Sequence, residues 1–246
     1  MLCSCTVKEN RSVCPCELLV RSEFPLKTDG SVLVSVIQDG TVVRQGMMSR
    51  EDFERDACTL TVPRRPSTVT VFSGITAMSA MEGKSLGIRR SYQCDEVYST
   101  SCFAPLEADS YDCLVTLHKS YARLFLTVLA LPEGARMRVS GTVDGYDLVS
   151  LEPSRGDFDC SPEPSGAPSD FLVRLPRQKD EGLCLNVIYP DGKMRSISLG
   201  AMISESGYSF DDPDLLDISL TVDLSKSYAF VHVFDWENEY YKQIDF

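Results

Sequence analysis

The chain has 246 residues, is 43% hydrophobic and carries a formal net charge of −12 at pH 7. This length is enough for one large domain or two modest ones with a buried core. The acidic balance excludes nucleic acid as an expected partner, because phosphate contacts need clustered Lys and Arg. No apolar run approaches the roughly 18 residues of a membrane-spanning helix, so no such helix is expected.

The first residues have the form of a bacterial lipoprotein cleavage site. In the sequence 2–5, Leu-Cys-Ser-Cys, an apolar residue lies three positions before a cysteine and a small residue directly precedes it. A polar stretch and a Cys-Pro-Cys triplet follow, ahead of an apolar run. We expect Cys5 to carry the lipid, with Cys3 as the alternative, and residues 1–16 to form the lipoprotein N-terminus and tether.

An export signal must precede such a site. It needs a basic region and roughly 7–15 apolar residues before the cleaved bond. Only four residues precede Cys5 in this sequence. We therefore expect the signal segment to be encoded upstream of Met1.

The next hundred residues are dominated by strand patterns. Residues 32–43 predict a hairpin, because Asp39-Gly40 supplies the positive φ of a tight turn. A short helix is expected where Ser49 and Asp52 have the spacing of a helix N-cap and its acidic partner. Two more strands are predicted at 58–62 and 68–72. The stretch 73–100 is polar and irregular and is expected to end this first unit.

A second series of strand patterns begins near residue 109. Predicted strands lie at 114–117, 123–131, 136–143, 170–175, 183–189, 193–199, 217–224 and 228–236. A turn is predicted at 189–192, and the Pro- and Ser-rich stretch 153–168 is expected to be an exposed loop. Short strands at this spacing predict an all-β fold of two consecutive β-sandwiches, 17–104 and 105–246, with one short helix in the first.

Ten cysteines favour an oxidising compartment. Cys58, Cys113 and Cys184 lie in apolar strand-like runs and are expected to be buried as small hydrophobic residues. Cys94 and Cys102 flank a short loop and could form a disulfide. Pairing of a cysteine in the Cys-Pro-Cys triplet with a later one remains open, as connectivity cannot be deduced from spacing.

Residues with catalytic or metal-binding chemistry are few. His118 and His232 could act as bases, but no nucleophile motif accompanies them. No C-x-x-C pair, P-loop or dinucleotide motif occurs. The acidic stretches 157–159 and 211–214 lack the spacing of a calcium loop and are expected to be solvated. We expect no catalytic residue, no metal and no cofactor.

Two other uses of these side chains remain open. Two carboxylates could converge in space as a glycosidase pair. Trp236, Tyr240 and Tyr241 could form a platform for stacking sugars, although a strand anchored in the core is the commoner use. Binding through the backbone needs no catalytic residue, because an exposed sheet edge can accept a partner strand.

The order of several motifs resembles the fimbrial anchor subunits of Bacteroidetes, the FimB-type fimbrillin-associated lipoproteins. The matching segments are residues 5–16, 117–129, 145–148, 222–224 and 231–236. Asn10 and Val13 depart from the pattern, since acidic residues are expected there. The cysteine content is also high for the family.

This resemblance implies two transthyretin-like β-sandwiches and a lipid on Cys5. It also implies a non-enzymatic subunit at the base of a type V pilus, which fixes the fibre to the outer membrane and limits its length. The implied partners are fimbrial stalk subunits, bound through strand addition, and the outer membrane. The alternative is a surface lipoprotein that binds glycan or host protein, and an extracellular hydrolase is a third reading.

Overall fold

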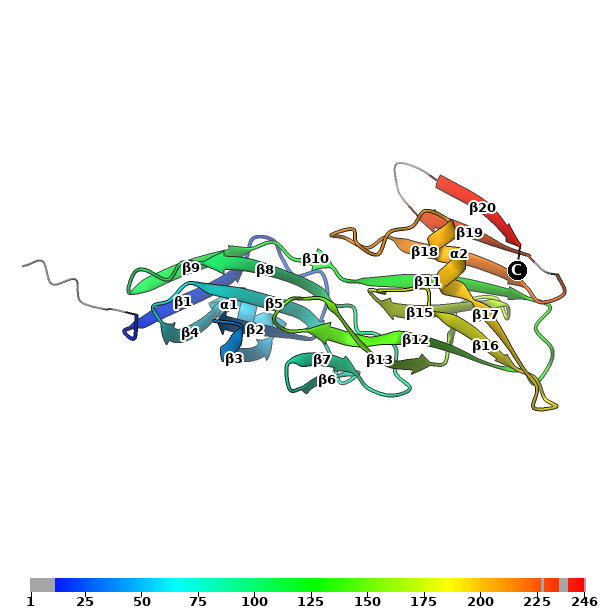
Figure 1. The fold of residues 1–246 in the computed structure, drawn as a ribbon, viewed down its shortest axis with the longest axis horizontal. Coiled ribbons are helices and arrows are strands. Elements are labelled where there is room, and N and C mark those ends of the chain that lie inside the picture. The colour runs from blue at the N-terminus through cyan, green and yellow to red at the C-terminus, as the bar shows by residue number, and fades with distance from the viewer. Residues whose placement is uncertain (1–11, 227, 235–238, 246) are drawn as a thin grey trace, which may run out of the picture.

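Alternating apolar side chains assemble the strands into four sheets, which form two sandwiches placed end to end along the long axis (Figure 1). The computed structural model describes residues 12–226, 228–234 and 239–245. The predicted all-β class is confirmed. Among the described residues, no helix has the length and apolar character needed to cross a bilayer.

The first sandwich packs a three-stranded sheet, β4-β1-β9, on a five-stranded sheet, β10-β8-β5-β2-β3. Leu18, Val34 and Val71 represent the apolar core buried between them. The strands are β1 (Pro15–Ser22), β2 (Ser31–Gln38), β3 (Thr41–Ser49), β4 (Cys58–Pro63), β5 (Ser67–Ile75), β8 (Tyr98–Ala104), β9 (Ser110–Val115) and β10 (His118–Lys119).

Local signals in this sandwich behave as predicted. Asp39 and Gly40 join β2 to β3 with positive φ angles of 50° and 71°. The predicted helix is α1 (Arg50–Asp56), and the Ser49 side chain accepts a hydrogen bond of 3.1 Å from the Asp52 backbone N–H. The helix buries Phe53 in the core.

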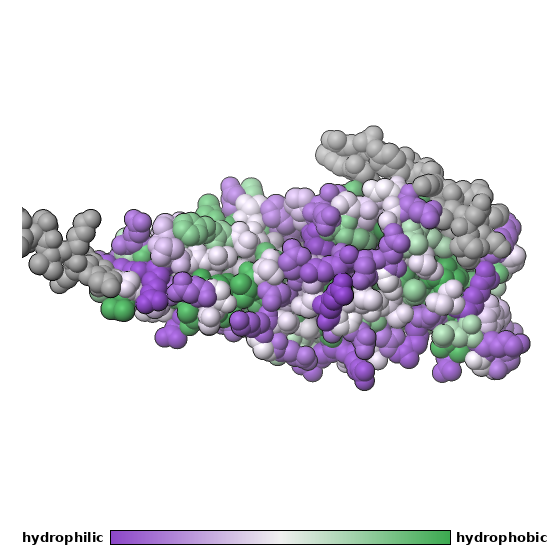
Figure 2. Space-filling view, in the orientation of Figure 1, coloured by the Kyte–Doolittle hydropathy of each residue, from purple (hydrophilic) through white to green (hydrophobic). Residues whose placement is uncertain are grey.

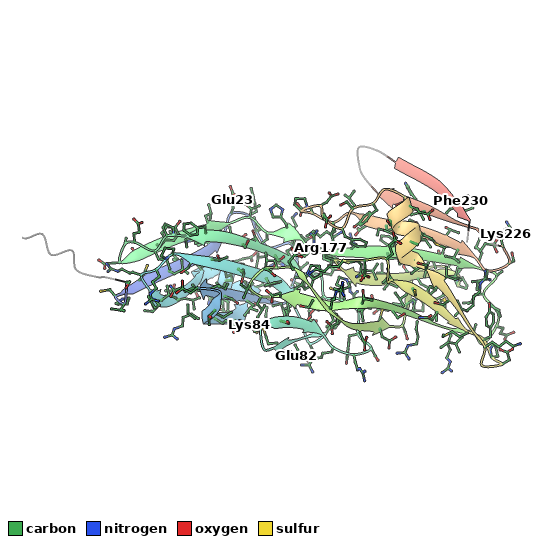
Figure 3. All side chains as sticks on the ribbon, viewed as in Figure 1. Glu23, Glu82, Lys84, Arg177, Lys226 and Phe230 are labelled. Atoms are coloured by element: carbon green, nitrogen blue, oxygen red, sulfur yellow. The ribbon has the colours of Figure 1, made fainter. Side chains whose placement is uncertain are left out.

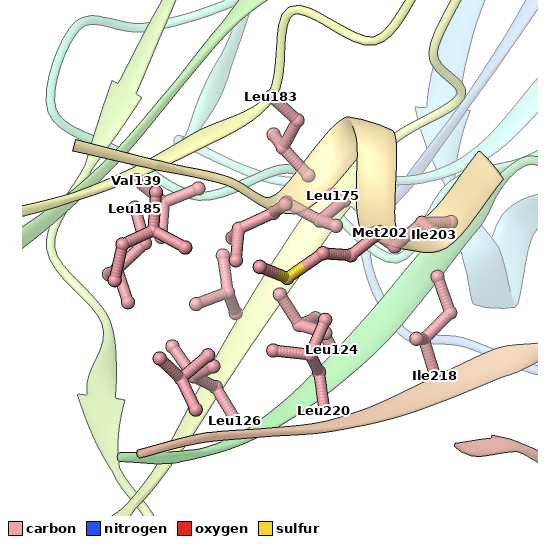
Figure 4. Packing of buried hydrophobic residues seen from close by; sticks show 14 of the residues in the cluster. Leu124, Leu126, Val139, Leu175, Leu183, Leu185, Met202, Ile203, Ile218 and Leu220 are labelled. Carbon is pink, nitrogen blue, oxygen red and sulfur yellow. The ribbon is translucent and has the colours of Figure 1, made fainter. Parts of the chain in front are cut away.

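The second sandwich packs the sheet β14-β15-β11-β18-β19-β20 on the sheet β17-β16-β12-β7-β6, with β13 also paired to β12. Leucines such as Leu124, Leu175 and Leu185 fill the space between the sheets (Figure 4). The strands are β6 (Ser79–Glu82), β7 (Ser85–Ile88), β11 (Tyr121–Leu129), β12 (Arg136–Asp147), β13 (Pro153–Cys160), β14 (Glu163–Pro164), β15 (Asp170–Pro176), β16 (Cys184–Ile188), β17 (Met194–Ser198), β18 (Asp217–Asp223), β19 (Tyr228–Phe234) and β20 (Glu239–Asp245).

A second helix, α2 (Leu199–Glu205), was not predicted. Ser198 caps it by accepting a hydrogen bond from the Ala201 N–H. Leu199, Met202 and Ile203 are buried in the second core, and Figure 4 shows Met202 and Ile203 there. These three apolar residues have helical spacing. Seven residues are too few for that spacing to stand out in a sequence dominated by strands.

The expected loop at 153–168 is wrong over its first half. Residues 153–160 form β13, which pairs antiparallel with β12 through two register irregularities and buries Phe158 and Cys160. Turn-forming residues dominate the composition there, but pairing with a long neighbouring strand overrides local preference. The irregular stretch predicted at 73–100 likewise contains the hairpin of β6 and β7.

The sheets also divide the chain differently from the predicted boundary at residue 104. Strands β9 and β10 belong to the first sandwich, whereas β6 and β7 join the second one by pairing β7 with β12. Long-range pairing causes this difference, because β9 lies parallel to β1, which is far from it in the sequence. The two sandwiches therefore exchange segments, and the chain passes directly from β10 through Ser120 into β11.

A third apolar cluster connects the two sandwiches. It contains residues from both, including Leu33 and Phe72 of the first and Tyr121, Tyr146 and Leu148 of the second unit. The Tyr146 hydroxyl donates a 2.6 Å hydrogen bond to the Ser120 carbonyl, where the chain crosses between sandwiches. Burial and this hydrogen bond together join the two units into one elongated body.

The junction should be sensitive to loss of the tyrosine hydroxyl. Tyr146→Phe leaves the buried Ser120 carbonyl without this donor, so the free energy of unfolding should fall by about 1–3 kcal/mol. Urea unfolding measures this, with Tyr92→Phe as the control because Tyr92 is exposed. Equal stability of the Tyr146 and Tyr92 variants would contradict a structural role for the hydrogen bond.

Candidate functional site

The first candidate site is the N-terminal strand β1, which occupies the middle of its sheet. It pairs antiparallel with β4 over residues 15–20 and parallel with β9 over residues 17–22. Cys16, Leu18 and Val20 point into the core and are fully buried, whereas Glu17 and Arg21 face out. β1 begins at the outer end of the first sandwich and is a central strand of its sheet (Figure 1).

Polar contacts hold both ends of this strand. At its start, the Arg64 N–H donates to the Cys14 carbonyl at 3.0 Å, and the Arg64 side chain pairs with Asp109. At its end, the Glu23 N–H donates to the Val115 carbonyl at 2.8 Å. Arg21 pairs with Asp112 on β9 at 3.1 Å in an exposed position. β1 is therefore fixed along its length and not only by its apolar face.

The sheets also present edges that could accept another strand. β3, an edge of the five-stranded sheet, has nine residues, and its Met47 is 52% exposed. At the second sandwich β17 is an edge, with Met194 63% exposed. Main-chain N–H and C=O groups at such edges are the usual sites of strand addition.

A polar groove of about 840 Å³ lies where the two sandwiches meet. Its walls include residues of β8, the 150–153 turn, the 177–181 loop and the 204–213 segment. The rings of Tyr208 and Phe210 lie edge to face there, with centroids 4.9 Å apart. Hydrophilic side chains cover much of the middle of the molecular face in Figure 2, and hydrophobic side chains lie there in scattered patches.

Arg177 shapes one wall of this groove and lies at the middle of the molecule (Figure 3). Its guanidinium donates to the backbone carbonyls of Phe210, Asp212 and Pro213. The bonds to Asp212 and Pro213 measure 2.8 Å and 3.1 Å. Arg177 therefore holds the backbone of residues 210–213.

His118 also lines the groove, and its Nδ1 lies 2.9 Å from Asp214 Oδ2. The nearby Ser120 hydroxyl bonds to the His118 carbonyl and to Ser99 Oγ instead of approaching the imidazole.

Asp159, in the other acidic stretch, pairs with Arg138. No group of three or more metal-ligating side chains occurs within residues that the structure describes.

The remaining predicted residues divide into three groups. Cys5 and Trp236 lie outside the described residues, and only the backbone is described at Tyr240 and Tyr241. Cys58 and Cys113 are buried as expected, and Cys184 is half-buried. The structure does not bring Cys94 and Cys102 together, because the Cys94 sulfur lies 3.7 Å from the Tyr146 hydroxyl and Cys102 faces Cys113.

Sequence reasoning missed an ionic cluster at the crossing between the sandwiches. Asp217, at the start of β18, accepts hydrogen bonds from Lys119 Nζ at 2.5 Å and from Arg123 Nε at 3.0 Å. Burial favours a higher pKa for Asp217, but the bonds from Lys119 and Arg123 outweigh it and lower that pKa. No motif marks these residues, since they are about 95 positions apart.

Comparisons with known proteins identify the fold. No protein-family model matches the chain, and no curated protein matches its sequence. Solved structures do match this chain. The fimbrial anchor protein Mfa2 from Porphyromonas gingivalis has a TM-score of 0.62 at 12% identity, over 85% of this chain and 91% of that one.

Two further structures have the same architecture. A polysaccharide-binding candidate from Bacteroides thetaiotaomicron has a TM-score of 0.64 at 11% identity, over 91% of this chain and 99% of the other. An adhesin candidate from Bacteroides ovatus has a TM-score of 0.55 at 10% identity, over 93% and 95%. At these identities the likeness shows a shared fold.

The Asp217 cluster should make the free energy of unfolding depend on pH in the acidic range. Because its pKa is lowered on folding, its contribution is full above the unfolded value of about 3.9 and is lost as pH falls through the folded pKa. Asp217→Asn should cost about 1–3 kcal/mol at pH 7, and the difference from wild type should shrink below pH 4. Urea unfolding at pH 7, 5 and 3 measures both effects.

Asp112→Asn provides the control for this series, since its pair with Arg21 is exposed and worth less than about 1 kcal/mol. A cost at Asp217 that stays constant from pH 7 to pH 3 would contradict the assigned cause.

Proposed function

We propose that this chain is a non-enzymatic anchor or assembly subunit of a fimbrium, fixed to the outer membrane by lipid on Cys5. It holds the base of the fibre at the cell surface and limits fibre length. The observation that carries the proposal is the fold shared with a fimbrial anchor protein over 85% of this chain. The lipoprotein-like sequence at residues 2–5 supports it.

The position of β1 suits a chain that is pulled from its N-terminus. A load entering through the tether reaches β1 almost directly, because β1 begins ten positions after Cys5. The hydrogen bonds to β4 and β9 lie across the pulling direction on both sides. Many of them must therefore break together before the strand leaves its sheet.

The lipid can supply the attachment. Each buried CH₂ contributes about 0.8 kcal/mol, and a single acyl chain gives marginal binding, whereas two or more give a stable anchor. A stalk subunit would bind through strand addition at an exposed edge such as β3. This mode uses main-chain hydrogen bonds and needs no catalytic group.

Replacing the lipidated cysteine tests the anchor directly. With a working export signal, Cys5→Ala should move the protein from the membrane fraction to the soluble periplasm, because the acyl chains have no attachment point. Cell fractionation followed by immunoblotting measures this. Cys14→Ala is the matched control in the same segment, and Cys3→Ala tests the alternative site. Unchanged membrane association of the Cys5 and Cys3 variants would refute lipid anchoring here.

Deleting the gene tests the fimbrial role. The fibres should be shed into the medium and be abnormally long, because nothing holds or terminates their base. Electron microscopy and sedimentation of shed fibres measure this, with the wild-type gene restored as the control. Fibres of normal length that stay attached to the deletion strain would contradict the role.

A second candidate function is glycan binding in the junction groove. It is favoured by polar walls beside the Tyr208 and Phe210 rings, since aromatic faces next to hydrogen-bonding groups suit sugars. Phe210→Ala should then weaken binding to a glycan array at least several-fold while fimbriae remain attached. Phe103→Ala, an exposed aromatic away from the groove lining, is the control. Array signals that are absent or equal in both variants would exclude this candidate.

A further inference from the structure

Two cysteines of the first sandwich face each other from opposite sheets. Cys102 lies on β8 of the five-stranded sheet, and Cys113 lies on β9 of the three-stranded sheet. Their sulfur atoms are 2.8 Å apart. Cys102 is half-buried, whereas Cys113 is buried. The pair therefore lies between the two sheets, with one partner half-buried and the other buried.

We propose that Cys102 and Cys113 form a disulfide that joins the two sheets of the first sandwich. A disulfide bond is about 2.05 Å long, so the sulfurs need to approach by only about 0.8 Å. They are eleven positions apart in sequence, on either side of the β8–β9 connection.

Cys94, which the sequence suggested as the partner of Cys102, lies in a different environment. Cys94 belongs to the cluster at the junction of the two sandwiches, beside the Tyr146 hydroxyl. Full burial raises its thiol pKa to about 12, which suppresses the reactive thiolate. Cys94 should therefore remain a thiol while Cys102 is oxidised.

The two partners are poised for different steps of thiol–disulfide exchange. Cys102 is the half-buried partner and is reached first from outside, whereas Cys113 is buried; their contact also lowers the pKa of the Cys102 thiol and raises that of Cys113. The Cys102 thiolate attacks the disulfide bond of a donor such as oxidised glutathione, which breaks the donor bond and releases one donor thiol after proton uptake. Cys113 then loses its proton, attacks the Cys102 sulfur and releases the second donor thiol. Two protein thiols are oxidised by two electrons, and the donor disulfide is reduced.

The bond would reinforce the sheet that contains β1. Because β9 is the parallel neighbour of β1, a link from β9 to β8 fixes that neighbour covalently to the opposite sheet. A loop of this length gains substantial stability from closure. This inference goes beyond the fimbrial role and does not depend on it.

Peptide mapping under non-reducing conditions tests the pairing. The folded protein is incubated with oxidised glutathione, free thiols are alkylated, and the chain is cut after Glu96 and Glu107. These cuts place Cys94, Cys102 and Cys113 in three different peptides, whereas trypsin leaves them together because no Lys or Arg lies between Arg90 and Lys119. A linked peptide containing Cys102 and Cys113 is expected, with Cys94 alkylated. A link from Cys94 to Cys102, or alkylation of both Cys102 and Cys113, would overturn the proposal.

Thermal unfolding provides the second readout. Dithiothreitol should lower the melting temperature of the oxidised protein by roughly 5–10 °C. The double variant Cys102→Ser, Cys113→Ser should show no dependence on reductant, whereas Cys94→Ala should keep it. A wild-type protein whose melting temperature is the same with and without dithiothreitol would also count against the disulfide.

Discussion

The architecture depends on burial of apolar side chains at the crossing between the two sandwiches. Tyr146 and Leu148, at the end of β12 and just beyond it, pack against Leu33 and Phe72 of the first unit. The Thr70 hydroxyl donates to the Leu148 carbonyl at 2.8 Å in the same interior. The chain crosses between the sandwiches at the β5–β6, β7–β8 and β10–β11 connections, and the shared core opposes a hinge motion there. The groove and the ionic cluster around Asp217 both lie at this crossing.

Local chemistry was predictable from the sequence where it is decided by neighbouring residues. The Asp39-Gly40 turn and the Ser49 cap each follow from conformational preferences of a few residues. The boundary between the two sandwiches was not predictable from the sequence, because it depends on β9 lying beside β1 and on β7 lying beside β12. Such pairing joins residues far apart in the chain, and alternation of apolar residues is the same whichever neighbour a strand takes.

The candidate sites show the same division. The lipoprotein-like segment is a local motif and could be recognised from residue order, although Cys5 lies outside the described residues. Loop spacing suggested Cys94 as the disulfide partner of Cys102, whereas the fold places Cys113 beside Cys102. The contacts of Asp217 with Lys119 and Arg123 had no sequence signal, since each residue alone is an ordinary surface charge in a strand pattern. Tertiary contacts decide these cases.

The contact between Arg177 and the 210–213 segment has a consequence for how this surface can evolve. Arg177 recognises carbonyl groups that every amino acid possesses, and no side chain of the segment takes part in those bonds. The side chains of Asp211 and Asp212 can therefore be exchanged while the path of the backbone is kept, whereas the Ser209 hydroxyl accepts a hydrogen bond from the Asp211 N–H and helps to hold that path. Selection could diversify what this wall of the groove displays, including its charge, without redesigning the scaffold. Arg177 itself has no such freedom, because lysine lacks the planar fork that reaches several acceptors at once.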